Sequence, residues 1–115
     1  MLDWVAYKKE LMGRIGEIAK LSPDTVKGYQ TLSAANAHKE DSLGAKTREL
    51  ISLAVAVTTR CDGCITVHTD AALKAGATRG EISEALGVAI AMNAGAALVY
   101  SARAMDAVEA YSAKA

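Results

Sequence analysis

Apolar side chains recur along this chain at helical spacing, and no stretch shows the strict alternation of a half-buried β-strand. The first stretch shows this most simply, because its apolar residues form one stripe made of Trp4, Leu11, Ile15 and Ile18. The pattern predicts an all-α protein of about six helices. The predicted helices span about Asp3 to Lys20, Pro23 to Ala37, Ala45 to Thr59, Asp62 to Ala75, Arg79 to Asn93, and a last segment that ends near Ser112.

Local signals define the ends of these helices. Ser22-Pro23-Asp24 supplies an N-cap, a proline at the first helical position and an acidic first turn. Gly76 is a C-cap candidate, and Thr78-Arg79-Gly80-Glu81 has the form of a capping box. The polar segment from His38 to Gly44 predicts a loop. Asn93-Ala94-Gly95 predicts a break or bend between the last two helices.

The sequence predicts how three of its segments pack. The third helix is almost wholly apolar from Leu50 to Val57, which is typical of a helix that is buried on all sides. The second helix is expected to bury Val26, Tyr29 and Leu32. Small residues dominate from Ala85 to Ala104, so another helix can approach closely there. That close packing fits either the interior of one subunit or a contact with a neighbouring chain.

The composition limits the size of the core. The 115 residues suit one domain over 1–115, and 51% of them are apolar, but only 4% are aromatic and phenylalanine is absent. Much of the apolar share is alanine, which buries little area per residue. We therefore expect a homo-oligomer in which contacts between copies supply the missing burial.

The charges of the chain are balanced. Lys+Arg and Asp+Glu number 13 each, and there is no basic stripe with interleaved aromatics, which argues against a nucleic-acid partner. The N-terminus lacks the basic and then apolar order of a secretory signal. The longest apolar run, Ala85 to Tyr100, contains Gly87, Asn93 and Gly95 and is too short to predict a membrane span. We expect a cytoplasmic protein with no membrane partner.

The only two cysteines lie in Cys61-Asp62-Gly63-Cys64, and His68 follows one helical turn later. In a cytoplasmic protein this spacing indicates either a redox dithiol or half of a metal site. A second ligand pair is missing and the cytoplasm keeps thiols reduced, so the dithiol interpretation is preferred. The pair falls at the predicted start of a helix, where unpaired N–H groups and the helix dipole favour a thiolate.

The residues next to the cysteines have structural as well as chemical interpretations. Asp62 opposes a thiolate through its negative charge but is a good N-cap, so a structural role is preferred. Gly63 allows the backbone to turn and is expected to leave space for a substrate. His68 falls on the same helical face as both cysteines, where an imidazole can accept or pass a thiol proton.

Glu49 is a further candidate, because it is one of few charges that lead into an apolar helix. The alternative is a hydrated helix start that it shares with Lys46 and Arg48. If the third and fourth helices pack antiparallel, Glu49 falls about one turn, or about 5.4 Å, beyond the residues opposite His68. This register permits a Glu49–His68–thiol relay without requiring it.

Zinc is the main alternative use of these side chains. Cys61, Cys64 and His68 offer three ligands on one helix, whereas structural zinc sites take four. His38 is remote in sequence and is expected to be a surface residue. We therefore expect neither a metal nor another cofactor.

The spacing Glu49-x11-Cys61-x2-Cys64-x3-His68 resembles the alkylhydroperoxidase D-like branch of the carboxymuconolactone decarboxylase superfamily, over roughly Lys46 to Tyr111. The resemblance implies an all-α fold, a homotrimer or homohexamer, and thiol-dependent peroxidase or disulfide reductase activity without haem, metal or flavin. It also implies roles for the residues. Cys64 would be the reactive thiol, Cys61 its disulfide partner, and Glu49 with His68 the proton relay.

Two departures from this resemblance concern the motif and the length. The better-studied hydroperoxidase has an aromatic residue between its cysteines, where this chain has Gly63, and it holds two repeat units rather than one. The decarboxylase that names the superfamily is not a CxxC enzyme, so its lactone chemistry is a poor inference here.

The function we expect is that of a peroxidase acting on small hydroperoxides with an external dithiol or thiol-protein reductant. The alternatives that stay open are a non-peroxidatic disulfide reductase, a carboxymuconolactone decarboxylase-like enzyme and a non-catalytic redox-sensing module.

Overall fold

The computed structural model describes residues 1–36 and 42–114, and all regular structure in these two ranges is α-helical. The prediction of an all-α fold is therefore confirmed. The predicted loop from His38 lies largely outside the described residues, as does Ala37, the expected end of the second helix. The helices are α1 (Trp4–Leu21), α2 (Pro23–Ala34), α3 (Gly44–Thr59), α4 (Asp62–Lys74) and α5 (Arg79–Ser112).

Side-chain hydrogen bonds cap the N-termini of α1 and α5. Asp3 Oδ1 accepts a hydrogen bond from the backbone N–H of Ala6 at 3.1 Å, and Thr78 Oγ1 accepts one from the N–H of Glu81 at 3.0 Å. The predicted cap at Thr78 is thus confirmed. Gly76 follows the end of α4 with a φ of +90°, a left-handed conformation that glycine adopts without steric cost.

The prediction of two separate helices at the C-terminal end is wrong, because α5 runs without interruption from Arg79 to Ser112. Asn93 does not break it. Its side-chain amide donates to the carbonyl of Ala89 at 2.7 Å and to Thr58 Oγ1 of α3 at 2.8 Å. The amide that could have competed with the helix backbone therefore ties α5 to α3 instead.

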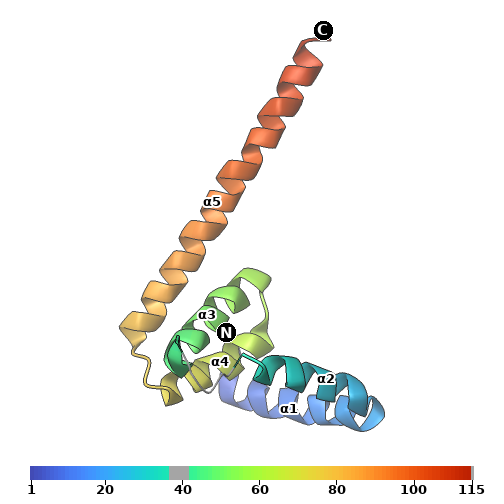
Figure 1. Ribbon diagram of the computed structural model, residues 1–115, viewed down its shortest axis with the longest axis vertical. Helices are drawn as coiled ribbons and strands as arrows, with labels where there is room; N and C mark the ends of the chain where they lie inside the picture. The colour runs from blue at the N-terminus through green and yellow to red at the C-terminus, as the bar shows by residue number, and fades with distance from the viewer. Residues whose placement is uncertain (37–41, 115) are drawn as a thin grey trace.

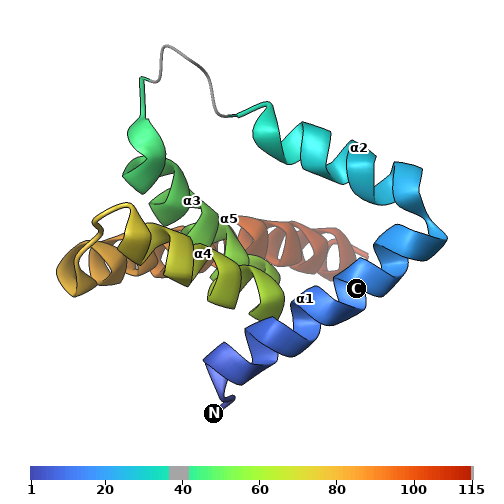
Figure 2. The same ribbon diagram turned by 90° about the horizontal axis from the view of Figure 1, so that it is seen from below.

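Two helices, α4 and α5, pack on α3 (Figures 1 and 2). α3 and α4 form an antiparallel hairpin, the first half of α5 lies along α3, and α1 packs against α4. α2 contacts α1 and no other helix within the described residues, and the two diverge from their connection as a V (Figure 2). The second half of α5 projects away from the other helices (Figure 1).

The buried core of one chain is small. Leu53, Ala72 and Ala77 form its centre, with Leu50 and Ile82 packed against them. Apart from Leu53, the buried apolar residues of the described ranges are all alanines: Ala56, Ala72, Ala77 and Ala89. This agrees with the thin core that the alanine-rich composition predicts.

Several burial predictions are wrong for the single chain. Tyr29 and Leu32 of α2 are exposed, because α2 has only α1 beside it. α3 is not buried on all sides either, since Ile51 and Val55 are 49% and 55% exposed. α4 and α5 cover two sides of α3 and leave the side that carries these residues open.

One hydrogen bond and one ion-pair cluster attach α1 to α4. Thr66 is buried, and its hydroxyl donates to the backbone carbonyl of Trp4 at 3.1 Å. Asp70 on α4 pairs with Lys8 of α1 and, at 2.8 Å, with Lys74 one turn along its own helix. Hydrogen bonds from Lys74 and Lys8 lower the pKa of the Asp70 carboxyl to about 2.

Acidification should weaken this attachment. Because the pKa of Asp70 is lowered on folding, its contribution to stability is complete above the ordinary value of 3.8 and is lost as the pH falls toward about 2. We expect the thermal midpoint of the wild type, followed by circular dichroism, to fall more over this range than that of Asp70→Asn.

Glu17→Gln is the matched control, because Glu17 pairs with Arg14 on an exposed face of α1 and not with α4. It should keep the wild-type dependence on pH. The same pH dependence in the wild type and in Asp70→Asn would contradict the role assigned to Asp70.

Candidate functional site

The CxxC segment lies where α3 turns into α4. Arg60 ends α3 with a φ of 54°, a left-handed conformation that few residues other than glycine adopt. The next N–H, that of Cys61, donates back to the carbonyl of Ala56 at 3.0 Å. This turn reverses the chain within two residues and puts Cys61 at the start of α4.

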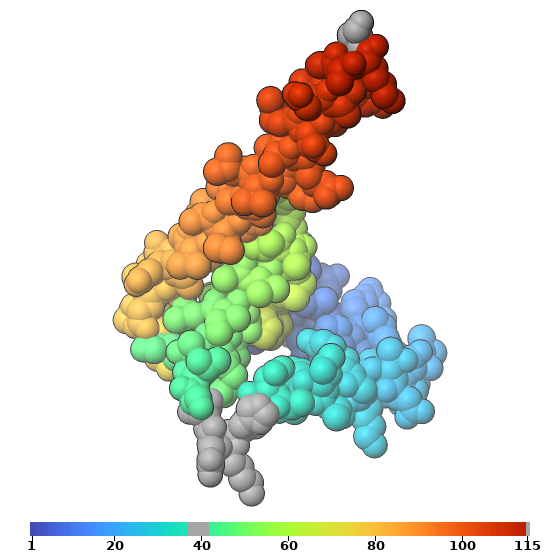
Figure 3. Space-filling model, turned by 45° about the horizontal axis from the view of Figure 1, so that its top comes forward, coloured from blue at the N-terminus to red at the C-terminus, as the bar shows by residue number. Residues whose placement is uncertain are grey.

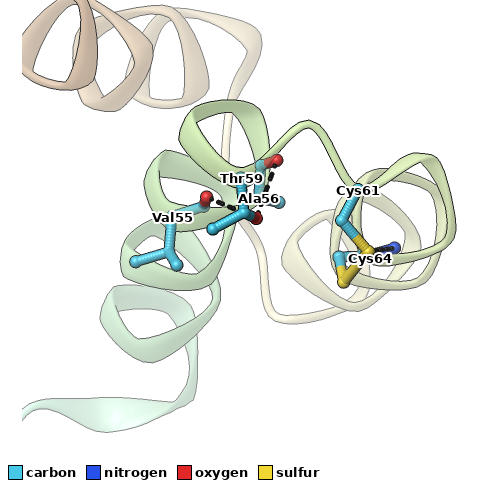
Figure 4. The surroundings of a disulfide bond; sticks show 5 residues. All are labelled: Val55, Ala56, Thr59, Cys61 and Cys64. Atoms are coloured by element: carbon cyan, nitrogen blue, oxygen red, sulfur yellow. Dashed lines mark hydrogen bonds between the residues drawn. A yellow bond between two sulfur atoms is a disulfide. The ribbon is translucent and has the colours of Figure 1, made fainter. Parts of the chain in front are cut away.

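Cys61 and Cys64 are joined by a disulfide across the first turn of α4 (Figure 4). Their Cα atoms are 5.2 Å apart, a separation that a disulfide bridges without moving the backbone. Cys61 is also the N-cap, since its Sγ accepts the backbone N–H of Cys64 at 3.2 Å. The expectation that Asp62 caps the helix is wrong. Asp62 is the exposed first residue of α4.

Glu49 and His68 contact each other directly within one chain. His68 Nδ1 lies 2.6 Å from Glu49 Oε2, and the side chains are 30% and 24% exposed. The antiparallel register predicts that Glu49 lies about one turn beyond the residues opposite His68. The packing of α3 on α4 brings the two side chains together despite this offset. A carboxylate facing Nδ1 accepts the N–H of that nitrogen, which leaves Nε2 as the nitrogen that exchanges a proton.

A pocket of about 260 Å³ lies between α3 and α4 beside the disulfide. We call it the redox pocket. Cys64 and His68 contribute to its wall, whereas Cys61 and Glu49 do not. The two cysteines are thus unequal, because only Cys64 shares this pocket with the imidazole. The lining residues are Ile51, Ser52, Val55, Ala56, Thr59, Cys64 and His68.

The α3 side of this pocket was not predicted from the sequence. Ile51 and Val55 belong to the apolar run that was interpreted as buried core, and Thr59 ends that run. The Thr59 hydroxyl donates to the carbonyl of Val55 at 3.0 Å, close to the disulfide (Figure 4). The interval of four residues between Ile51, Val55 and Thr59 places them on one helix face. That spacing is the signal that could have identified a pocket wall.

Gly63 has a different role from the one expected. A Cβ at this position would lie 2.8 Å from Cδ2 of Leu11, so the space beside Gly63 holds an α1 side chain rather than a substrate. The missing side chain allows α1 to pack against the CxxC turn. Gly63 is therefore a packing residue, and the open side of the site is the redox pocket.

Among residues 1–36 and 42–114, no three His, Cys, Asp or Glu side chains converge as they would around a metal ion. His38, the distant candidate ligand, lies outside the described residues.

Residues 23–107 match the model of the Carboxymuconolactone decarboxylase family. The chain belongs to this family, and the family resemblance drawn from the Glu49, CxxC and His68 spacing is confirmed.

Two relatives of the chain have names that assign no activity. An uncharacterized protein of Haemophilus influenzae is 49% identical over 105 residues, which cover 91% of this chain and 92% of that protein. Uncharacterized protein 4 in the cox locus of Paracoccus denitrificans is 33% identical over 95 residues, covering 83% and 85% of the two chains.

A solved structure has the same fold. It is the apo form of a carboxymuconolactone decarboxylase family protein from Legionella pneumophila, with a TM-score of 0.73 and 35% sequence identity. The match covers 86% of this chain and 88% of that chain.

Replacing Gly63 by phenylalanine should loosen α1. The ring would enter the space of Leu11, and overpacking of this kind costs about 1–3 kcal/mol. We expect a lower urea midpoint for Gly63→Phe. The double variant Gly63→Phe/Leu11→Ala should lose less free energy of unfolding than the two single variants lose together, because the two sites are in contact.

Gly16→Phe is the control for the change in helix propensity, since a Cβ at Gly16 of α1 meets nothing within 4 Å. Additive losses of unfolding free energy in the double variant would show that Gly63 does not stabilise the packing of α1 through Leu11.

Proposed function

We propose that this chain is a thiol-dependent peroxidase that reduces small hydroperoxides through the Cys61–Cys64 pair. The observation that carries the proposal is the shared pocket. Cys64, which forms the disulfide with Cys61, lines the redox pocket together with His68. The Nδ1 atom of His68 faces Glu49, which leaves Nε2 for proton transfer. Family membership supports a redox role, and the CxxC pair favours peroxide chemistry over lactone decarboxylation.

In the first step the reduced Cys64 attacks the peroxide. Its position in the first turn of α4 favours the thiolate, because the N-terminal N–H groups and the helix dipole attract negative charge. The sulfur takes the terminal oxygen of ROOH and becomes a sulfenic acid, while the O–O bond breaks. His68 delivers a proton to the departing alkoxide, which leaves as ROH.

In the second step Cys61 closes the disulfide. Its thiol attacks the Cys64 sulfur, the S–O bond breaks, and the oxygen leaves as water. One peroxide has then been reduced to an alcohol and water, and two thiols have been oxidised to one disulfide. The structure holds the pair in this oxidised form.

An external dithiol or thiol-protein restores the enzyme by thiol–disulfide exchange and is itself oxidised to a disulfide. We place the protein in the cytoplasm, where thiol reductants of this kind are abundant. Glu49 and His68 carry the protons of both half-reactions. No metal, haem or flavin is required by these steps.

Peroxide consumption with a dithiol donor tests the proposal. Cys64→Ser should abolish turnover, since no nucleophile remains in the pocket. In the absence of the donor, Cys61→Ser should react once and then stop at the sulfenic acid, which dimedone traps for mass spectrometry. His68→Ala should lower kcat by about 10²–10⁴-fold, the usual contribution of a general acid–base.

Thr69→Ala is the matched control for His68→Ala. Thr69 is the next residue of α4, but it faces the side of the helix where Trp4 and Lys8 of α1 lie. It should keep wild-type turnover. Undiminished peroxide consumption in Cys64→Ser would overturn the proposal.

The same variants separate the alternatives. Turnover of a disulfide substrate without peroxide consumption would indicate a disulfide reductase. Activity that survives loss of both cysteines would indicate a decarboxylase-like enzyme. A disulfide that forms without turnover with any dithiol donor would indicate a redox sensor.

Glu49 is a positioning residue, because it acts on the reacting sulfur only through His68. Glu49→Gln keeps the size of the side chain and removes its charge. We expect kcat to fall by about 10–100-fold, as for other partners that orient a functional histidine, with KM little changed. Glu84→Gln, on an exposed part of α5, is the control. An unchanged kcat in Glu49→Gln would remove Glu49 from the relay.

A further inference from the structure

The single chain exposes far more surface than its mass predicts. Its accessible surface is 9110 Å², whereas a compact monomer of 12.0 kDa exposes about 6,000 Å². Its radius of gyration is 19.4 Å, compared with about 13 Å for a compact domain of this length. The difference, about 3,000 Å² for one chain, is large enough to supply that chain's share of an obligate interface.

The second half of α5 accounts for much of this excess. Every residue from Ala96 to Ser112 is exposed, and we call this segment the α5 extension. It projects beyond the other helices (Figure 3). Leu98, Val99 and Tyr111 point in different directions around the helix and are 76%, 74% and 77% exposed. A helix with large apolar side chains on several sides needs other surfaces to cover them.

A membrane would be one such cover, since α5 has the length and apolar composition of a membrane-crossing helix. Its position argues against this. The first half of α5 packs on α3, and Asn93 is hydrogen-bonded to Thr58 there. The extension itself carries Arg103, Asp106 and Glu109, which find partners on a protein surface but not in lipid.

The chain also carries an open apolar groove. It lies between α3 and α5, has a volume of about 410 Å³, and is lined mainly by Ile51, Ala54, Val55, Val88, Met92 and Asn93. We call it the α3–α5 groove. Ile51 and Val55 also line the redox pocket, so the groove and the pocket share one wall. Whatever fills the groove also borders the site of Cys64.

We propose that the α5 extension of a second copy of this chain covers the α3–α5 groove and closes the outer side of the redox pocket. Each copy exposes an apolar helix, the α5 extension, and an open apolar groove. If the helix of one copy binds in the groove of another, both apolar surfaces are buried. The closed pocket would admit small solutes to Cys64 and exclude large ones. The proposal uses the proposed function only in taking Cys64 as the reacting thiol.

Mass and hydrogen exchange of the wild-type protein test the assembly. Light scattering should give at least twice the chain mass of 12.0 kDa at micromolar concentration. Backbone amides of the α5 extension should exchange far more slowly than those of a solvated helix. A monomer, or an extension that exchanges as a free helix does, would overturn the proposal. Cosedimentation of a monomer with phosphatidylcholine–phosphatidylglycerol vesicles would overturn it in favour of a membrane.

Leu98→Glu tests the interface itself. A carboxylate buried without a partner should raise the dissociation constant by about a hundredfold or more. Gln30→Glu adds the same charge on an exposed position of α2 and should leave the mass unchanged. Equal masses for the wild type and Leu98→Glu would overturn the interface.

The closure of the pocket has its own readout, which needs no peroxide turnover. In reduced protein, the alkylation rate of Cys64 by a bulky maleimide, relative to iodoacetamide, should rise severalfold when Leu98→Glu dissociates the copies. An unchanged ratio in dissociated protein would overturn the closure. These results remain meaningful if the chain has no peroxidase activity, so the two proposals fail separately.

Discussion

Close packing of α3 on α4 is the constraint on which the site depends. Leu53 and Ala72 are almost fully buried in the small core, and Ala56 is buried near the turn that joins the two helices. Small side chains let helix backbones approach closely, and this approach brings Glu49 within 2.6 Å of His68. Larger side chains at these alanines would separate the helices and leave the carboxylate short of the imidazole.

The short turn between these helices makes two identical residues chemically different. Cys61 caps α4, and its sulfur accepts the N–H of Cys64. Cys64, one turn along, lines the redox pocket with His68. The same packing leaves the pocket half open, because α3 is covered on only two sides in one chain. A peroxide needs access to the sulfur, whereas a proton relay works best away from bulk water, and a wall supplied by a second copy would meet both needs.

The features that were predicted correctly are local ones. Helix positions follow from apolar spacing and from capping residues such as Thr78, and the CxxC pair at the start of a helix follows from the same signals. The errors come from contacts between distant segments. The sequence predicts a helix break or bend at Asn93, but the Asn93 amide donates a hydrogen bond to Thr58 and the helix continues. The sequence predicts space for a substrate beside Gly63, but Leu11 of α1 occupies that space. Neither partner lies near its residue in sequence.

The sequence by itself determined the helical class and the family, and it placed the CxxC pair at the start of a helix with His68 one turn later, because spacing along a helix depends only on neighbours a few residues away. Tertiary structure decided which of those residues meet. The crossing of α3 and α4 brings Glu49 to His68, and the open side of α3 turns an apolar run into a pocket wall. These outcomes depend on how helices approach one another in space, and the periodicity of a single helix does not contain that information.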